Sequence, residues 1–179
     1  MKARTLAPAL ALLALTACGG ADYGFSRNYH PLSQEEQALR EANLPGYEEV
    51  HTNPAAFRAQ TIAWFGVVSS IEAGPNGQSL LHMTFRTHQD RHLCADETDG
   101  SCRVTVSDRS TGPYSVLLTV RPEDASGHDG IAVGSLLRTF GHTTGDIDSD
   151  GGPVLAVTYY RHWPRGAWVT TADRVRMRR

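Results

Sequence analysis

The 179-residue sequence predicts an all-β domain: a small, closed or partly closed antiparallel barrel of five to six strands, preceded by one or two short helices. Three observations support this class. Beyond Phe57 no segment has good helical periodicity, whereas six segments have the composition and alternation of strands. Turn-forming residues separate these segments. The first of them carries Gly66 at its centre, where a strongly bent strand can cross from one side of a barrel to the other.

The first 17 residues have the order of a secretory signal peptide: a basic start, an apolar stretch from Leu6 to Leu15, and small residues before Cys18. The apolar stretch is too short to span a bilayer, which needs ~20 residues. Leu15-Thr16-Ala17-Cys18 resembles the lipobox of bacterial lipoproteins, in which the cysteine is acylated and becomes the new N-terminus. We therefore expect a signal peptide over 1–17 and a lipid anchor on Cys18. The alternative is an ordinary signal peptide cut near Ala17.

Gly19 follows the cysteine where inner-membrane retention signals usually have aspartate, so the resemblance implies an outer-membrane location. Loss of Lys2 and Arg4 on cleavage would leave 15 basic against 19 acidic residues. This mild acidity argues against a general nucleic-acid binder, and nucleic acid is not an expected partner. Residues 18–32 are predicted to be a flexible tether, and residues 33–179 a single domain with a basic C-terminal tail.

Two short helical segments are predicted before the strands. Ser33 and Glu36 have the spacing of a capping box, which predicts a helix over 34–44 that ends at Pro45. Residues 53–57 begin with Asn-Pro, a cap followed by proline at the first helical position, and predict one further helical turn.

Side-chain alternation predicts which residues of the strands face the core. In the second strand Leu81 and Phe85 face inward and His82 outward. In the last strand Tyr159 and Trp163 share a face and are expected to close the barrel core. Some of the six segments can be halves of one bent strand. They are Thr61–Ile71, Ser79–Thr87, Cys102–Ser107, Tyr114–Val120, Gly134–His142 and Val154–Trp163.

Cys94 and Cys102 enclose a polar, turn-rich loop of seven residues. In an oxidising envelope compartment such a pair predicts a disulfide, which would stabilise the fold by ~2 to 3 kcal/mol. The alternative is a zinc site made by these cysteines with His88 and His92, since these residue types bind zinc. The spacing is not that of a standard zinc module and export disfavours free thiolates, so we prefer the disulfide.

A family resemblance extends from Asn53 to Trp168. Residues 53–68 resemble the opening of the Slp family of outer-membrane lipoproteins, in which an Asn-Pro segment and a glycine-containing strand begin an OB-type (oligonucleotide/oligosaccharide-binding) barrel. Phe140-Gly141-His142 and Val154–Trp163 are similar to that family's closing strands. The resemblance implies an OB-type barrel in a starvation- or stress-associated envelope lipoprotein without known catalysis.

A calcium site is one candidate function of the sequence around Gly151. Asp146, Asp148 and Asp150 alternate before this glycine, as in the first half of a calcium-binding loop. Position twelve of that pattern is Val157 instead of glutamate, and the flanks are predicted strands instead of helices. An acidic hairpin tip without a metal is therefore the preferred interpretation.

Tyr160 and Trp168 are candidates for ligand contact, because aromatic rings near arginines can stack on sugars or bases. No nucleophile elbow, HExxH motif or paired carboxylate and histidine is recognisable, so the sequence predicts no enzyme and implies no cofactor. The expected function is that of a lipid-anchored, non-enzymatic outer-membrane protein with an envelope-protein or glycan partner. The alternative is a module that binds glycan, lipopolysaccharide or calcium.

Overall fold

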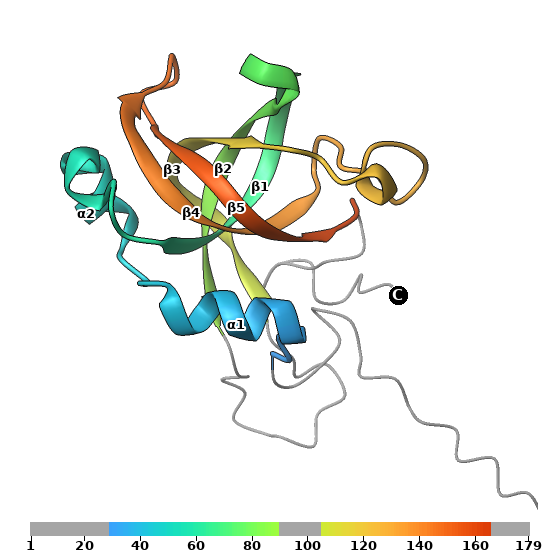
Figure 1. Ribbon diagram of the computed structural model, residues 1–179, viewed down its shortest axis with the longest axis horizontal. Helices are drawn as coiled ribbons and strands as arrows, with labels where there is room; N and C mark the ends of the chain where they lie inside the picture. The colour runs from blue at the N-terminus through green and yellow to red at the C-terminus, as the bar shows by residue number, and fades with distance from the viewer. Residues whose placement is uncertain (1–28, 90–104, 166–179) are drawn as a thin grey trace, which may run out of the picture.

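The protein folds around a closed five-stranded barrel (Figure 1), described here from a computed structural model for residues 29–89 and 105–165. The strands close in the order β1-β2-β3-β5-β4, and only the pair β3–β5 is parallel. This order defines a barrel of OB type and confirms the predicted fold class. The strands are β1 (Ile62–Ala73), β2 (Ser79–Gln89), β3 (Thr105–Leu118), β4 (Leu136–Ile147) and β5 (Pro153–Trp163).

Five strands replace the six predicted segments, because two of them are halves of β3. The polar residues between the two segments continue the strand, and β3 stays paired with β2 from Ser79↔Leu118 to Gln89↔Thr105. Two register irregularities, between Thr84 and Arg86 and between Arg86 and His88, let this long pair bend.

The helical segments differ from the prediction in length and in their capping residue. The described residues form two α-helices, α1 (Ser33–Glu41) and α2 (Tyr47–Thr52), and three 3₁₀ turns, η1 (Pro54–Phe57), η2 (Pro75–Gly77) and η3 (Pro122–Asp124). The turn η1 was predicted, and α2 was not, since six residues are too few to establish a helical period. The predicted first helix began one residue after α1 and ended three residues beyond it, and the prediction named Glu36 as the capping glutamate. Instead the Glu35 carboxylate accepts the Leu32 N–H at 3.2 Å.

Glu35 is fully buried and fixes α1 to the barrel. Its carboxylate oxygens each accept a hydrogen bond at 2.9 Å, one from Arg138 on β4 and one from Arg161 on β5. The Tyr29 hydroxyl also donates to this carboxylate. Burial and the neighbouring carboxylate raise the pKa of Tyr29, so its proton is retained for that bond. We call Tyr29, Glu35, Arg138 and Arg161 the Glu35 cluster.

Gly66 lies where the side chain of Tyr114 crosses β1 inside the barrel. A Cβ placed on Gly66 would stand 2.3 Å from the Tyr114 hydroxyl oxygen, so a larger residue would displace this fully buried ring. The glycine predicted to allow a bend therefore serves a close approach between β1 and β3. The core around it is continuous and contains Val50, Ile62, Trp64, Val68, Leu81, Met83, Tyr114, Val116, Leu118, Leu137, Leu155 and Tyr160.

A bulge in β5 corrects the prediction for its aromatic residues. Phe140 pairs with Tyr159 and Gly141 with Val157, so Thr158 is an extra residue that reverses the alternation. Tyr160 consequently enters the core, whereas Tyr159 is only half-buried. Trp163 is buried in a separate cluster with Phe65, Val106 and Leu136, against which Tyr29 packs.

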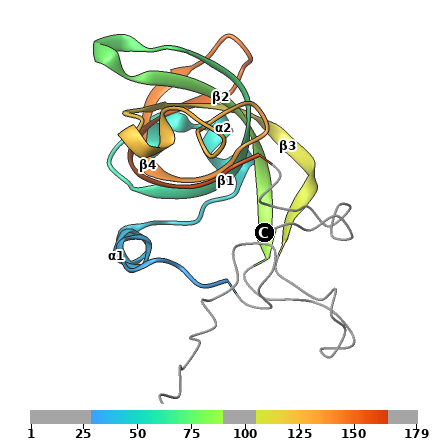
Figure 2. The same ribbon diagram turned by 90° about the vertical axis from the view of Figure 1, so that its right-hand side faces the viewer.

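Helix α1 and two of the hairpins lie on opposite sides of the barrel. Figure 1 shows α1 below the barrel, while the β1–β2 and β4–β5 hairpins project on the other side. Figure 2, turned by 90°, shows β2 and β3 extending together beyond the barrel toward the α1 side. Over residues 29–89 and 105–165, no helix has the length and apolar character needed to cross a bilayer.

Candidate functional site

His82 lies in a polar cluster on the outside of the barrel that the sequence did not indicate. Alternation placed its side chain outward from β2, and this is correct, but the residue is only 7% exposed. Ser115 is its direct cross-strand neighbour on β3. The turn between β4 and β5 brings Asp148 and Asp150 against the same imidazole, and Glu72 approaches from β1. We call these five residues the His82 cluster.

The two nitrogens of the His82 ring face different groups. Nδ1 lies 3.0 Å from the Ser115 hydroxyl oxygen, 3.4 Å from Asp150 Oδ2 and 3.8 Å from Asp148 Oδ2. Nε2 lies 3.6 Å from Glu72 Oε1. The Ser115 hydroxyl donates to Asp148 Oδ2, so it orients that carboxylate. His82 and Asp148 are nearly enclosed, with side chains 9% and 6% exposed, whereas Glu72 and Asp150 form the solvent-facing rim.

The turn that carries the two aspartates is held rigidly against β3. Asp148 Oδ1 accepts the N–H groups of Asp150 and Gly152, each at 2.9 Å. Gly152 has no room for a side chain, since a Cβ would lie 2.3 Å from the Pro113 carbonyl oxygen. His51 on α2 also contacts the turn, with Nε2 at 2.9 Å from the Gly151 carbonyl oxygen. These contacts fix the Asp148 carboxylate and the backbone of the turn that carries Asp150.

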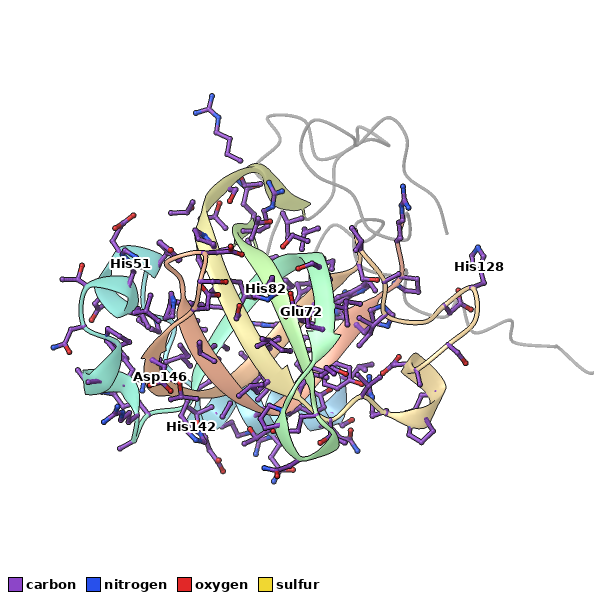
Figure 3. The ribbon with its side chains drawn as sticks, turned by 90° about the horizontal axis from the view of Figure 1, so that it is seen from above. His51, Glu72, His82, His128, His142 and Asp146 are labelled. Atoms are coloured by element: carbon purple, nitrogen blue, oxygen red, sulfur yellow. The ribbon has the colours of Figure 1, made fainter. Side chains whose placement is uncertain are left out.

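The structure divides the three aspartates predicted as calcium candidates. Asp148 and Asp150 join His82 in a group whose ligand atoms all lie within 4.8 Å of one another. Asp146 is the exposed, penultimate residue of β4 and does not belong to that group. In Figure 3 His82 and Glu72 lie together near the middle of the view, while Asp146 lies apart from them. The alternation of the three aspartates in the sequence did not predict which of their carboxylates lie close together.

A groove of about 470 Å³ lies between α1 and the barrel. Its floor includes the buried rings of Trp64 and Phe85, and Leu44 at its edge is 67% exposed. Arg86 and Arg138 also line the groove, and the charge of Arg138 is paired with that of Glu35. A groove with aromatic and guanidinium groups can accommodate an amphipathic or anionic ligand.

Tyr160, predicted as a ligand contact, has its hydroxyl engaged inside the protein. The hydroxyl donates to Asp124 Oδ2 at 2.8 Å and accepts the Arg121 N–H at 2.9 Å. Its ring also lines a smaller pocket of about 270 Å³ beside Arg121. Burial alone would raise the pKa of Asp124, but hydrogen bonds from Tyr160, Arg121 and His162 hold it below its ordinary value.

Asp124, His162 and Ser135 are connected in the order of a serine–histidine–aspartate triad. His162 Nδ1 lies 3.1 Å from Asp124 Oδ1, and its Nε2 lies 3.1 Å from the Ser135 hydroxyl oxygen. Ser135 is fully buried, however, and its hydroxyl also accepts the Ala132 N–H. No substrate can reach that oxygen without rearrangement. We therefore interpret the row of Asp124, His162 and Ser135 as a structural contact between β5 and η3. The prediction that the chain is not an enzyme stays a prediction.

Several predicted residues lie outside the described residues: Cys18, Cys94, Cys102, His92 and Trp168. The lipid anchor, the disulfide and the alternative zinc site therefore stay predictions. Of that zinc set only His88 is described, and its ring stacks on Phe65 with centroids 4.3 Å apart.

Comparison with known proteins gives no family assignment for this five-stranded barrel of OB type. No protein-family model matches the chain, and no curated protein matches it. Two solved structures are similar over 57% of this chain. The protein priB from Ralstonia solanacearum matches over 96% of its own chain at 10% identity, with a TM-score of 0.29. A small single-stranded DNA-binding protein from Streptomyces coelicolor matches over 90% of its chain at 15% identity, with a TM-score of 0.32.

These neighbours correct one expectation from the sequence. The prediction that nucleic acid is not a partner is contradicted by a structural neighbour that is named as a single-stranded DNA-binding protein, and it is withdrawn. The mild acidity of the whole chain does not exclude such a partner, because binding depends on the local charge of one face. At these TM-scores the likenesses assign no ligand to this chain.

Proposed function

We propose that the chain is a lipid-anchored, non-enzymatic protein of the bacterial outer membrane, held at the membrane by Cys18 and presenting its barrel as a compact domain. The lipobox-like segment that ends at Cys18 carries this proposal. The resemblance of residues 53–68 to the Slp family adds a stress- or starvation-associated structural role.

The distance between the proposed anchor and the barrel supports a role close to the bilayer. Tyr29, a member of the Glu35 cluster, lies eleven positions after Cys18. A fully extended chain spans at most ~3.3 to 3.6 Å per residue, so the tether reaches roughly 40 Å. The α1 side of the barrel would therefore stay within about that distance of the membrane.

The test uses a bacterium with an inner and an outer membrane. Cells that express Cys18→Ala, Cys94→Ser or Gly19→Asp are fractionated, one variant at a time. Cys18→Ala should leave the membrane fraction and remain folded by circular dichroism, whereas Cys94→Ser, the matched cysteine control, should stay membrane-bound. Gly19→Asp should move the protein to the inner membrane. A Cys18→Ala protein that still sediments with membranes would exclude the anchor.

A second candidate function, the binding of lipopolysaccharide or another anionic glycan, is favoured by the groove between α1 and the barrel. Leu44 offers an exposed apolar contact at its edge, Trp64 and Phe85 offer aromatic surface, and Arg86 contributes a guanidinium group to the lining. Aromatic rings beside guanidinium groups suit sugar rings that carry phosphate or carboxylate.

The groove is tested by titrating the full chain with lipopolysaccharide, with a single-stranded oligonucleotide as the comparison probe. Saturable binding of lipopolysaccharide should weaken in Leu44→Asp and persist in Ile147→Asp, which alters an exposed apolar residue that does not line the groove. Equal weakening in both variants, or tighter binding of the oligonucleotide, would refute the glycan assignment.

A further inference from the structure

The His82 cluster has the spacing of a metal-binding site. Zinc ligands stand 2.0 to 2.2 Å from the metal, so two of them at tetrahedral angles are roughly 3.4 Å apart. His82 Nδ1 and Asp150 Oδ2 are separated by 3.4 Å, and His82 Nδ1 and Asp148 Oδ2 by 3.8 Å. All three ligand atoms lie within 4.8 Å of one another. Small side-chain rotations would bring them onto one ion.

The surroundings of these three ligands match those of metal-bound residues. A histidine that binds a metal through one nitrogen typically donates its other ring N–H to a carboxylate. Glu72 is placed for this role, since its Oε1 lies 3.6 Å from His82 Nε2 on the side away from the aspartates. Ser115 supplies a hydroxyl that already donates to Asp148 Oδ2. These outer groups come from β1 and β3, independently of the turn that carries the aspartates.

The charge of the cluster is unbalanced. Three carboxylates, those of Glu72, Asp148 and Asp150, surround one imidazole. Among the described residues, these carboxylates form ion pairs only with His82 and none with an arginine. Since Asp148 is nearly enclosed, its charge is poorly screened by water. A divalent cation would neutralise this concentration of negative charge.

We propose that His82, Asp148 and Asp150 bind a divalent transition-metal ion of the zinc class, with Glu72 and Ser115 as outer-shell groups. Three protein ligands leave a fourth position open to solvent on the exposed side of Asp150. The imidazole favours zinc, nickel or cobalt over calcium, which takes six to eight oxygen ligands. This inference is independent of the lipid anchor and of the groove.

Protonation of His82 is the competing means of balancing the charge. A protonated imidazole would be attracted to the same carboxylates without any metal. The two interpretations differ in what they predict for zinc: only the metal site gives saturable zinc binding that depends on Asp150. Asp150 is suited to this comparison because its side chain is 58% exposed and can be changed without disturbing the core.

The test is titration of the full, tag-free, chelator-treated chain with Zn²⁺, followed by isothermal calorimetry and thermal denaturation. Loss of an outer-shell partner typically weakens metal binding by about tenfold or more. Because Asp150 is proposed as a direct ligand, Asp150→Asn should weaken zinc binding by more than about tenfold. Asp146→Asn, which removes an exposed aspartate from the same hairpin but not from the cluster, should leave the affinity unchanged. Co²⁺ bound by the wild type should give a visible absorption spectrum that Asp150→Asn loses.

Three outcomes would overturn the proposal. One is the absence of any saturable zinc binding by the wild type. Another is zinc binding of equal affinity in Asp150→Asn, which would assign the metal to other residues, such as the two cysteines of the sequence-based alternative. The third is a preference for Ca²⁺ or Mg²⁺ over Zn²⁺, which would exclude the transition-metal class.

Discussion

The Glu35 cluster and the His82 cluster are both built from charged side chains packed against the barrel, yet they differ in charge balance. Glu35 is fully buried between two arginines at 2.9 Å, and Tyr29 donates a further hydrogen bond. The His82 cluster gathers three carboxylates around one imidazole. Two of those carboxylates, Glu72 and Asp150, face solvent.

The difference distinguishes a structural contact from a site that can accept a ligand. In the Glu35 cluster every carboxylate oxygen has a cationic partner, and each guanidinium also lies over aromatic rings, Arg138 over Phe65 and Arg161 over Trp163. Such a network is complete without a further ion. In the His82 cluster hydrogen bonds hold Asp148 in the same way, but the cluster lacks a positive charge of similar strength. Carboxylates gathered at one place with incomplete charge compensation can accept a cation.

The largest expected effect is that of Glu35→Ala, which breaks the balanced cluster. Removing one partner of a buried ion pair costs about 3 to 5 kcal/mol because the remaining charges are left uncompensated. Urea denaturation should show this loss in the free energy of unfolding. Glu36→Ala, which removes the exposed neighbouring glutamate of α1, is the control and should change stability by less than about 0.5 kcal/mol. Similar small losses in both variants would show that Glu35 is not a structural anchor.

A smaller effect is expected from acid, acting on the buried row of Asp124, His162 and Ser135. Burial lowers the pKa of His162 below its ordinary value of 6.5, against the opposing influence of Asp124. Below that value the unfolded chain binds a proton that the folded chain does not, so stability falls as pH falls. Thermal denaturation between about pH 7.5 and pH 5 should show this decline.

Two histidine variants assign the decline. His162→Gln should flatten it, whereas His128→Gln should retain it, because the side chain of His128 is 94% exposed. Identical pH profiles for wild type and His162→Gln would assign the acid sensitivity to other groups. The row of Asp124, His162 and Ser135 is intermediate between the two clusters. Its charges are balanced at neutral pH and unbalanced once the His162 imidazole is protonated.

The smallest expected effect on stability is that of Glu72→Gln, at the rim of the His82 cluster. Its side chain is 63% exposed, and surface ion pairs contribute about 0 to 1 kcal/mol, so the free energy of unfolding should change by less than about 0.5 kcal/mol. Removing one of three like charges offsets the loss of its contact with His82. Chemical denaturation is the measurement, and a loss above about 2 kcal/mol would show that the His82 cluster is structural.

Much of the barrel could be predicted because alternation is a local property of the sequence. Leu81 and Phe85 face the core as predicted, and Tyr114, Val116 and Leu118 share one buried face. Prediction failed where a bulge inserts a residue. Thr158 adds one position to β5 opposite β4, and this reversed the assignment of Tyr159 and Tyr160. Nothing in the pattern of apolar residues announces such an insertion.

The candidate site was only half predictable. Asp148 and Asp150 stand in a recognisable acidic turn, and the sequence identified that turn. His82 lies 66 positions before Asp148. The pattern of its strand does not distinguish it from the other outward-facing residues, which are all expected to be exposed to solvent. The contact between them depends on the parallel pairing of β3 with β5, which brings the turn beside Ser115 and thus beside its cross-strand neighbour His82. Which residues this pairing brings together is set by the topology of the sheet and cannot be inferred from the local sequence pattern.

The closure of the barrel also has a kinetic consequence. Ile62 pairs with Gly141 and Ser115 with Val154, so the two seams that close the barrel join residues roughly 80 and 40 positions apart. Folding slows as contacting residues become more distant in sequence, and barrels dominated by such contacts fold in milliseconds to seconds. The β1–β2 and β4–β5 hairpins can form early, whereas β1 and β4 keep unpaired edges until the seams close. Those edges can pair with another chain, so a nascent copy is most prone to aggregation in that interval.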